Sequence, residues 1–300
     1  MKRKLVKQGS ATLMISLPSK WIKLNELDKG SEIDLVEKDN QLIISKDING
    51  TKKEIIINIS SLTESSIRTI ITNTYRIGYG SILLNYANKD YFKIINEVVN
   101  KNLIGFEIIK KSDKSCRIEN ITEPTKEQFD NIFSKVLSNI NELYEVAVKN
   151  LEGGKEEFED IERNIQKFDN FCRRVISKES LDNKELLLAF HTGLIHAQRD
   201  IYLMLKYIEK TKIKSDKNLT DLLKESRKMF DLLVDGYKNK DIKTLEKIHE
   251  KEKEIIYKKG YSLLEKSKEP VIIHHLLDSI RNLYLASSPL MGSSLVVRSY

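Results

Sequence analysis

Apolar residues recur at intervals of three and four over residues 125–287, and this spacing places them on one face of an α-helix. One such stripe runs along Ile132, Val136 and Ile140. About half of the chain is therefore predicted to lie in these helices. The predicted helices cover about residues 125–150, 155–178, 183–210, 216–238, 241–266 and 269–287.

Long antiparallel helices joined by short turns form bundles. These six helices fit either one bundle or two three-helix bundles in series, and their spacing favours two, at 125–210 and 216–287. Two of the helix starts have the spacing of a capping box, one at Thr125 to Gln128 and one at Asp182 to Glu185.

The N-terminal end differs from the rest of the chain in charge. The whole chain has a net charge of +7, which by itself does not indicate a nucleic-acid binder. Residues 1–25 contain no acid, whereas residues 26–50 hold seven acids against three lysines. The cations of the first segment are Lys2, Arg3, Lys4, Lys7, Lys20 and Lys23.

This head is predicted to contain strands at 5–8 and 12–17, a short helix at 20–24 after Pro18, and a hairpin of strands 31–37 and 41–45. So small a unit buries too little apolar surface to be stable alone. We expect two copies to pair, with Trp21 in the dimer core. A two-fold dimer with lysines on one face suits DNA.

The segment KLVKQGSATLMISLPSKWIKLNELDKGSEIDLVEKDNQLIIS resembles the AbrB/SpoVT/MazE swapped-hairpin DNA-binding domain. The resemblance implies that two chains interleave their hairpins and that basic residues of the first hairpin and its flank meet DNA. Lysines predominate among these residues, which favours phosphate contacts with modest sequence preference. The alternative is that these side chains are only solvated. The implied DNA-binding residues are Arg3, Lys4, Lys7, Gln8, Ser10 and Lys20.

Residues 51–122 are predicted to form a small α/β domain. A strand at 55–59 precedes a helix that opens with a capping box at Ser61 to Glu64, and a second helix follows to about residue 102. Strands at 106–110 and 116–121 then form a hairpin. Four tyrosines here are attributed to helix packing rather than to base stacking: Tyr75, Tyr79, Tyr86 and Tyr91.

The complete layout resembles the archaeal PhoU-like phosphate-uptake regulators. The segments that carry the resemblance are LLNYANKDY through LIGFEII, FDNFCRRVIS and HHLLDSIRNLYLASSPL. It implies a mixed fold: a swapped-hairpin β domain at 1–50, the α/β domain at 51–122, and an all-α pair of three-helix bundles at 123–300. Regulators of this kind act on phosphate transport and signalling.

The same resemblance implies metal clusters held by E-x-x-x-D motifs, in which residues at i and i+4 share a helix face. The first motif is incomplete, because Ile165 stands four residues before Asp169. In the second repeat Glu250 and Glu254 keep the spacing and could hold a divalent or iron-type metal. The alternative is an ordinary salt-bridged surface, given the neighbouring lysines.

Two His–Asp pairs at i,i+4, His196 with Asp200 and His274 with Asp278, are too few ligands for a site and are attributed to core packing. No nucleophile, phosphate-loop or zinc-protease motif is present, so we expect no catalysis.

Cys116 and Cys172 are predicted to be buried, inert thiols. With no apolar run long enough for a bilayer and no signal peptide, we expect a cytoplasmic protein that is not integral to the membrane.

The leading hypothesis is a homodimeric regulator of phosphate uptake, with a DNA-binding head and a helical bundle that senses a signal or binds a partner. The alternative is an adaptor that acts on a membrane phosphate transporter or sensor kinase without binding DNA. The C-terminal tail, SSPLMGSSLVVRSY, is expected either to cap the last bundle or to contact a second chain.

Overall fold

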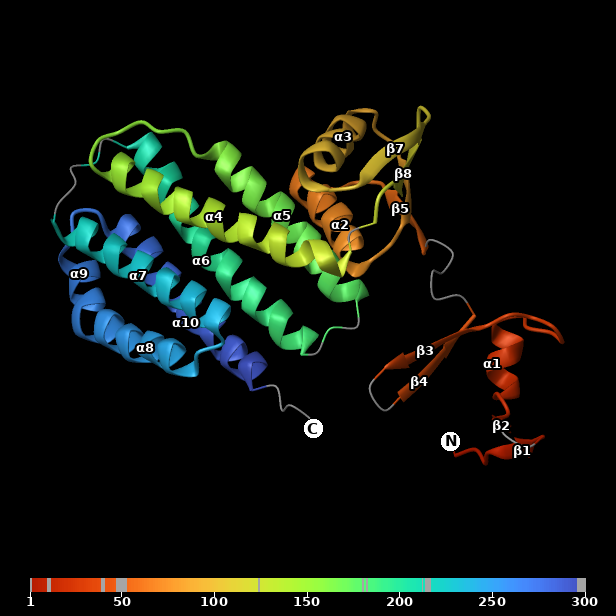
Figure 1. Cartoon of the computed structure of the whole chain (residues 1–300). Helices are drawn as coiled ribbons and strands as arrows, with labels where there is room; N and C mark the ends of the chain where they lie inside the picture. The colour runs from red at the N-terminus through yellow and green to blue at the C-terminus, as the bar shows by residue number, and fades with distance from the viewer. Residues whose placement is uncertain are drawn as a thin grey trace. The chain divides into compact units, whose positions relative to one another are not determined.

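The computed structural model describes residues 2–9, 12–38, 41–46, 53–123, 125–179, 181, 183–211, 213 and 217–295. The chain divides into two compact units, Met1–Lys53 and Glu54–Tyr300. The first is a small unit of hairpins, and the second combines a sheet with the long helices (Figure 1).

The N-terminal unit contains two separate hairpins and a short helix. Strands β1 (Val6–Gln8) and β2 (Thr12–Met14) pair antiparallel, as do β3 (Asp34–Lys38) and β4 (Gln41–Ser45). Helix α1 (Ser19–Leu24) starts after Pro18, whose carbonyl accepts hydrogen bonds from the backbone N–H groups of Trp21 and Ile22. The predicted order of strands and helix is confirmed.

The second unit begins with a four-stranded sheet in the order β5-β6-β8-β7. Strands β5 and β6 are parallel, and the other neighbours are antiparallel. Helices α2 and α3 pack against each other, and their apolar residues share one buried core with the sheet (Figure 1). The elements are β5 (Glu54–Ile59), α2 (Glu64–Ile77), β6 (Ser81–Tyr86), α3 (Asp90–Asn102), β7 (Phe106–Lys111) and β8 (Ser115–Asn120).

Two predictions for this part were wrong in detail. Strand β6 was missed, although it lies between β5 and β8 in the sheet. It is largely buried on both faces, so it lacks the alternation that identifies a half-exposed strand. The N-cap of α2 is Thr63 rather than Ser61, because the Thr63 side chain accepts from the Ser66 N–H at 3.2 Å.

The remaining chain is helical, close to the predicted ranges. Two differences concern the C-terminal part: the helix expected at 241–266 contains a π-helical segment, and the last helix continues through Pro289. The capping box expected at Asp182 involves a residue outside those described. The elements are α4 (Lys126–Leu151), α5 (Glu159–Lys178), α6 (Lys184–Lys210), α7 (Lys217–Asn239), α8 (Ile242–Lys253), the π-helix η1 (Glu254–Gly260), α9 (Tyr261–Lys266) and α10 (Pro270–Ser294).

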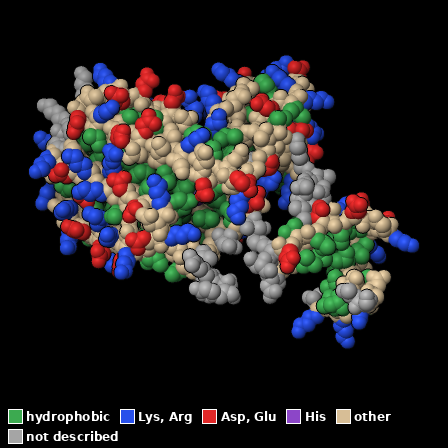
Figure 2. All heavy atoms as spheres, in the orientation of Figure 1, with side chains coloured by type: hydrophobic (Ala, Val, Ile, Leu, Met, Phe, Trp, Pro, Cys, Tyr) green, Lys and Arg blue, Asp and Glu red, His purple; other side chains and the backbone are tan. Residues whose placement is uncertain are grey.

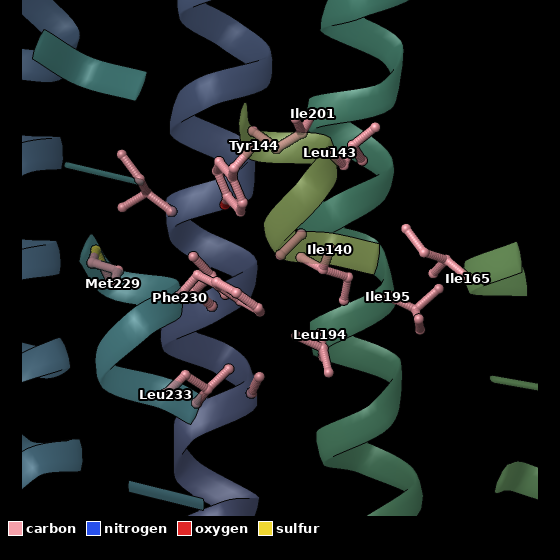
Figure 3. Packing of buried hydrophobic residues seen from close by; sticks show 14 of the residues in the cluster. Ile140, Leu143, Tyr144, Ile165, Leu194, Ile195, Ile201, Met229, Phe230 and Leu233 are labelled. Carbon is pink, nitrogen blue, oxygen red and sulfur yellow. The ribbon is translucent and has the colours of Figure 1, made fainter. Parts of the chain in front are cut away.

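Helices α4, α5 and α6 pack against one another, as do α7, α8 and α10, and one continuous cluster of buried side chains spans these two triplets. Within it, Ile140 of α4, Leu194 of α6 and Phe230 of α7 lie in the same buried layer (Figure 3). The two triplets join where α6 packs along α10. Among the described residues, no helix combines the length and apolarity that crossing a bilayer requires.

Candidate nucleic-acid interface

The N-terminal unit exposes its apolar side chains. No described residue of this unit is buried. Figure 2 shows hydrophobic side chains over its visible surface. A unit of this size cannot be stable without a core, so its apolar side chains have to be buried against another surface. The exposed large apolar residues are Leu5, Val6, Leu13, Met14, Ile15, Leu24, Leu35, Val36, Leu42 and Ile43.

The β3–β4 hairpin is apolar on both faces. Successive residues of a strand point to opposite faces, so Val36 with its partner Ile43 lies on one face and Leu35 with Ile44 on the other. Leu35 and Leu42 are 58% and 59% exposed. Because a single covering surface would bury only one face, this hairpin is suited to a position between other elements.

The predicted DNA-binding residues lie in and around the first hairpin. Arg3 and Lys4 precede β1, Lys7 and Gln8 lie within it, and Lys20 is in α1; all five are exposed. The sixth predicted residue, Ser10, is outside the described part of the chain.

The first hairpin separates two of these residues. Lys7 is paired with Leu13 and Gln8 with Thr12, so Lys7 and Gln8 point to opposite faces of the hairpin. Within one copy, the predicted residues therefore do not form a single patch.

The cations of the head are available to an external anion. Within residues 2–23, as far as they are described, no acid is present. Arg3, Lys4, Lys7 and Lys20 make no ion pair with any residue of known position. The acids of the unit come later, from Glu26 onward. Positive side chains without a local counter-charge are those that displace counterions from DNA phosphates.

The N-terminal segment matches a known family. Residues 6–52 match the family described as antidote-toxin recognition MazE, bacterial antitoxin. The match includes Lys7, Gln8 and Lys20, and Arg3 and Lys4 lie before it. It supports the predicted N-terminal swapped-hairpin domain. No curated protein and no solved structure matches the chain.

The residues around the predicted metal ligands do not complete a metal site. Glu250 lies in α8 and Glu254 is the first residue of η1; both are exposed, and Glu254 lies 4.0 Å from the ammonium of Lys259. Among the described residues, no group of three or more His, Cys, Asp or Glu side chains is placed to hold a metal ion. The metal at Glu250 and Glu254 stays a prediction without a third ligand.

The buried carboxylate of this helix is Glu252, which the sequence prediction did not single out. It is 2% exposed and forms an ion pair with Arg281 of α10. The sequence spacing could have indicated this burial. Glu252 lies four residues after the buried Ile248, so the two residues share one face of the helix.

The histidine pairs do not form sites either. His274 and Asp278 are 3.4 Å apart on the surface of α10. His196 is exposed, and Asp200 instead accepts a hydrogen bond from Asn282 at 2.9 Å.

Cys116 and Cys172 are buried thiols, as predicted. Burial raises the pKa of Cys116 to about 11, so this thiol is protonated at neutral pH.

The segment FDNFCRRVIS forms a polar network that sequence reasoning did not foresee. Asp169 is fully buried; its carboxylate lies 2.6 Å from Arg173 Nε, 3.6 Å from Arg76 Nη2 and 3.2 Å from His191 Nδ1. Burial by itself would raise the pKa of Asp169, but the His191 contact and the arginine charges hold it below its ordinary value. The aspartate that resembled half of a metal motif is therefore paired with two arginines, Arg76 and Arg173.

Proposed function

We propose that the protein is a DNA-binding regulator that acts as a homodimer, with the N-terminal hairpins of two copies interleaved. The observation that carries this proposal is the described part of the N-terminal unit, in which large apolar side chains are exposed and Arg3, Lys4, Lys7 and Lys20 form no ion pair with a described residue. The match to the MazE family over residues 6–52 supports the same assignment.

A second copy would bury the exposed apolar side chains of this unit and would also double its basic surface. Interleaving encloses both faces of the β3–β4 hairpin, which is apolar on each side. The two-fold axis of the dimer then duplicates Arg3, Lys4, Lys7 and Lys20, and a pair of equivalent basic surfaces suits a pseudo-palindromic DNA site. Most of these contacts are expected to be to phosphates, so affinity falls steeply as salt increases.

The process under control is proposed to be phosphate uptake, and the helical part is proposed to sense the signal or bind a partner without catalysis. This rests on the resemblance of the helical segments to phosphate-uptake regulators. The competing function is an adaptor that contacts a transporter or sensor kinase, with the head used only to dimerise. Genomic footprinting of the tagged protein at high and low phosphate tests the DNA target and the signal together.

The direct test measures binding to duplex DNA at increasing salt by fluorescence anisotropy. The full-length triple variant Lys4→Ala, Lys7→Ala, Lys20→Ala is expected to lose affinity uniformly across sequences and to have a shallower salt slope. A matched control removes three exposed lysines of the helical part, Lys126, Lys155 and Lys224. Equal affinity of the two triple variants, or no DNA binding by the wild type at about 50 mM salt, contradicts the DNA-binding role and favours the adaptor.

A further inference from the structure

A polar cleft of about 570 Å³ lies where the α/β part meets the helices, between α2, α5 and α6. It belongs entirely to the unit Glu54–Tyr300. Four arginines line it, Arg68, Arg76, Arg173 and Arg199, together with His196. The other lining residues are Ser, Thr, Asn and Gln, with one Ile, and no carboxylate lines the cleft within the described part of the chain.

The acids that neutralise these arginines are unevenly distributed. Arg68 is bound by two carboxylates, those of Glu64 and Glu97, at 2.7 Å and 2.9 Å. Arg76 and Arg173, in contrast, share the single carboxylate of Asp169. Among the described residues, one positive charge therefore remains uncompensated at the Arg76–Arg173 end of the cleft.

The buried network holds these two guanidinium groups in place. Asn170 is buried; its amide oxygen accepts from Arg76 Nε at 2.7 Å, and its amide nitrogen donates to the Asn102 carbonyl at 3.0 Å. Thr192 accepts from Arg173 Nη1 at 3.0 Å. Arg173 Nη2 donates to no described residue. Donors fixed in this way lose little conformational entropy when an anion binds.

The third cation of the cleft approaches from α6. Arg199 is about half exposed, donates to Glu162 at 2.7 Å through Nη1, and lies over the Tyr202 ring at 4.6 Å. Its Nε and Nη2 donate to no residue in the described ranges. Because Arg199 lies on a different helix from Arg76 and Arg173, an anion in the cleft can be contacted from more than one side.

We infer that this cleft binds a phosphorylated small molecule. Guanidinium groups match the oxygens of a phosphoryl group through paired N–H donors, and the hydroxyl and amide groups of the lining supply further hydrogen bonds. The volume lies in the range of small-molecule sites and is larger than a single phosphate ion requires. No Phe, Tyr or Trp side chain is among the described lining residues, so recognition relies mainly on the phosphoryl group.

This inference deepens the proposed function, because it assigns a ligand class to the part of the chain proposed to sense a signal. Binding at the cleft itself needs neither the head nor DNA. The two ideas can therefore fail separately: the head variant with three lysines replaced tests the DNA role and is expected to keep the affinity of the cleft for its ligand.

The test uses isothermal titration calorimetry on the full chain, with inorganic phosphate, pyrophosphate and ATP as probes and citrate as a polyanion without phosphorus. Asn73→Asp is the informative variant, since Asn73 is exposed and its amide oxygen lies 3.4 Å from Arg76 Nη1. The new carboxylate neutralises Arg76 with almost no change in shape. Asn164→Asp, on an exposed position of α5 outside the cleft, is the matched control.

We expect at least one phosphate probe to bind saturably, with affinity reduced about tenfold or more by Asn73→Asp and unchanged by Asn164→Asp. Arg173→Lys keeps the positive charge but loses the paired N–H donors of the planar guanidinium, so it should also weaken binding. Inorganic phosphate as the tightest probe identifies free phosphate as the source, and pyrophosphate or ATP identifies an organic or condensed phosphate. The inference is overturned by citrate binding as tightly as every phosphate probe, by equal affinities of the two Asn variants, or by no saturable binding.

Discussion

At the scale of single residues, Arg174 shows how the two parts of the second unit are joined. It is fully buried, and its Nη1 donates to the carbonyls of Tyr75 and Tyr79 at 2.6 Å and 2.9 Å. Its other two nitrogens donate to the carboxylate of Glu123 at 2.9 Å and 3.0 Å. A buried charge is tolerated only when its donors are satisfied in this way. The carbonyls at the end of α2 thus fix the position of α5.

Replacing Arg174 with Ala should lower the free energy of unfolding by about 1–3 kcal/mol, because the Tyr75 and Tyr79 carbonyls and the Glu123 carboxylate each lose a hydrogen-bond donor. Glu123 keeps its ion pair with Lys178 at 3.1 Å. Chemical denaturation followed by circular dichroism measures this change. Arg163→Ala, on the exposed face of the same helix, is the control and should stay within about 0.5 kcal/mol. Similar losses for both variants would show that Arg174 does not join the two parts.

A second residue-scale prediction concerns His191, which is buried 3.2 Å from Asp169 and packs against the Phe133 ring at 4.6 Å. Burial and the nearby Arg173 lower the pKa of His191, although Asp169 opposes this. The unfolded chain therefore binds a proton near pH 6.5 that the folded chain binds only at lower pH. Stability should fall as pH decreases below about 6.5.

Denaturant titrations at a series of pH values, on wild type and His191→Gln, check this expectation. The variant should lose part of the slope between about pH 6.5 and pH 5, because its side chain does not titrate. Identical slopes for the two proteins would contradict the lowered pKa of His191. An additional loss at still lower pH is expected in the wild type from protonation of Asp169, whose folded-state pKa is below its ordinary value.

At the scale of elements, the long helices could be predicted from sequence and several of their details could not. A period of three and four is a property of one segment, so it identifies α4 to α7 before any contact is known. The extension of α10 through Pro289 depends instead on packing, since the buried Ala286 and Leu290 lie on either side of the proline. Arg173 and Arg174 are adjacent in sequence, but Arg173 lines the cleft whereas Arg174 lies in a buried interface. This difference depends on their contacts with other elements, which the sequence pattern does not show.

The contact of α6 with α10 depends on a glycine. A Cβ atom at Gly193 would lie 2.9 Å from the Ala286 Cβ and 3.0 Å from its backbone. Gly193→Ala should therefore lower the free energy of unfolding by about 1–3 kcal/mol, although alanine normally favours a helix.

Thermal and chemical denaturation measure this effect, with Gly292→Ala as control. At Gly292 the nearest atom to an added Cβ is the end of the Leu186 side chain, at 3.0 Å, which can move aside. We expect a clearly smaller loss there. Stabilisation by Gly193→Ala would contradict the close approach of α6 and α10.

At the scale of the whole molecule, the two units differ in how complete they are. The unit Glu54–Tyr300 has two hydrophobic cores of its own, one in the α/β part and one in the helices. The unit Met1–Lys53 has no buried residue among those described. The sequence indicated this difference correctly, because the head lacks the length for a core. It could not indicate the arginine cleft, which brings together arginines of three separate helices.

A truncated chain that starts at residue 54 should therefore remain folded and become monomeric, whereas the full chain should be a dimer. Analytical ultracentrifugation gives the two masses, and circular dichroism shows whether the shortened chain keeps its helices. The full chain with the three head lysines replaced is the control, because it changes charge while keeping the apolar surface. A dimer that persists without residues 1–53 would place the contact between copies in the helices.

The missing core of the head also makes the amount of protein a regulatory variable. If the DNA-binding surface forms only when two heads dimerise, a chain diluted below its dimer dissociation constant does not bind its DNA site. In that regime, occupancy of the DNA site rises with the square of the concentration, so a twofold change in synthesis produces about a fourfold change in bound dimer. The expression level of this protein would then set the threshold at which it starts to control its genes.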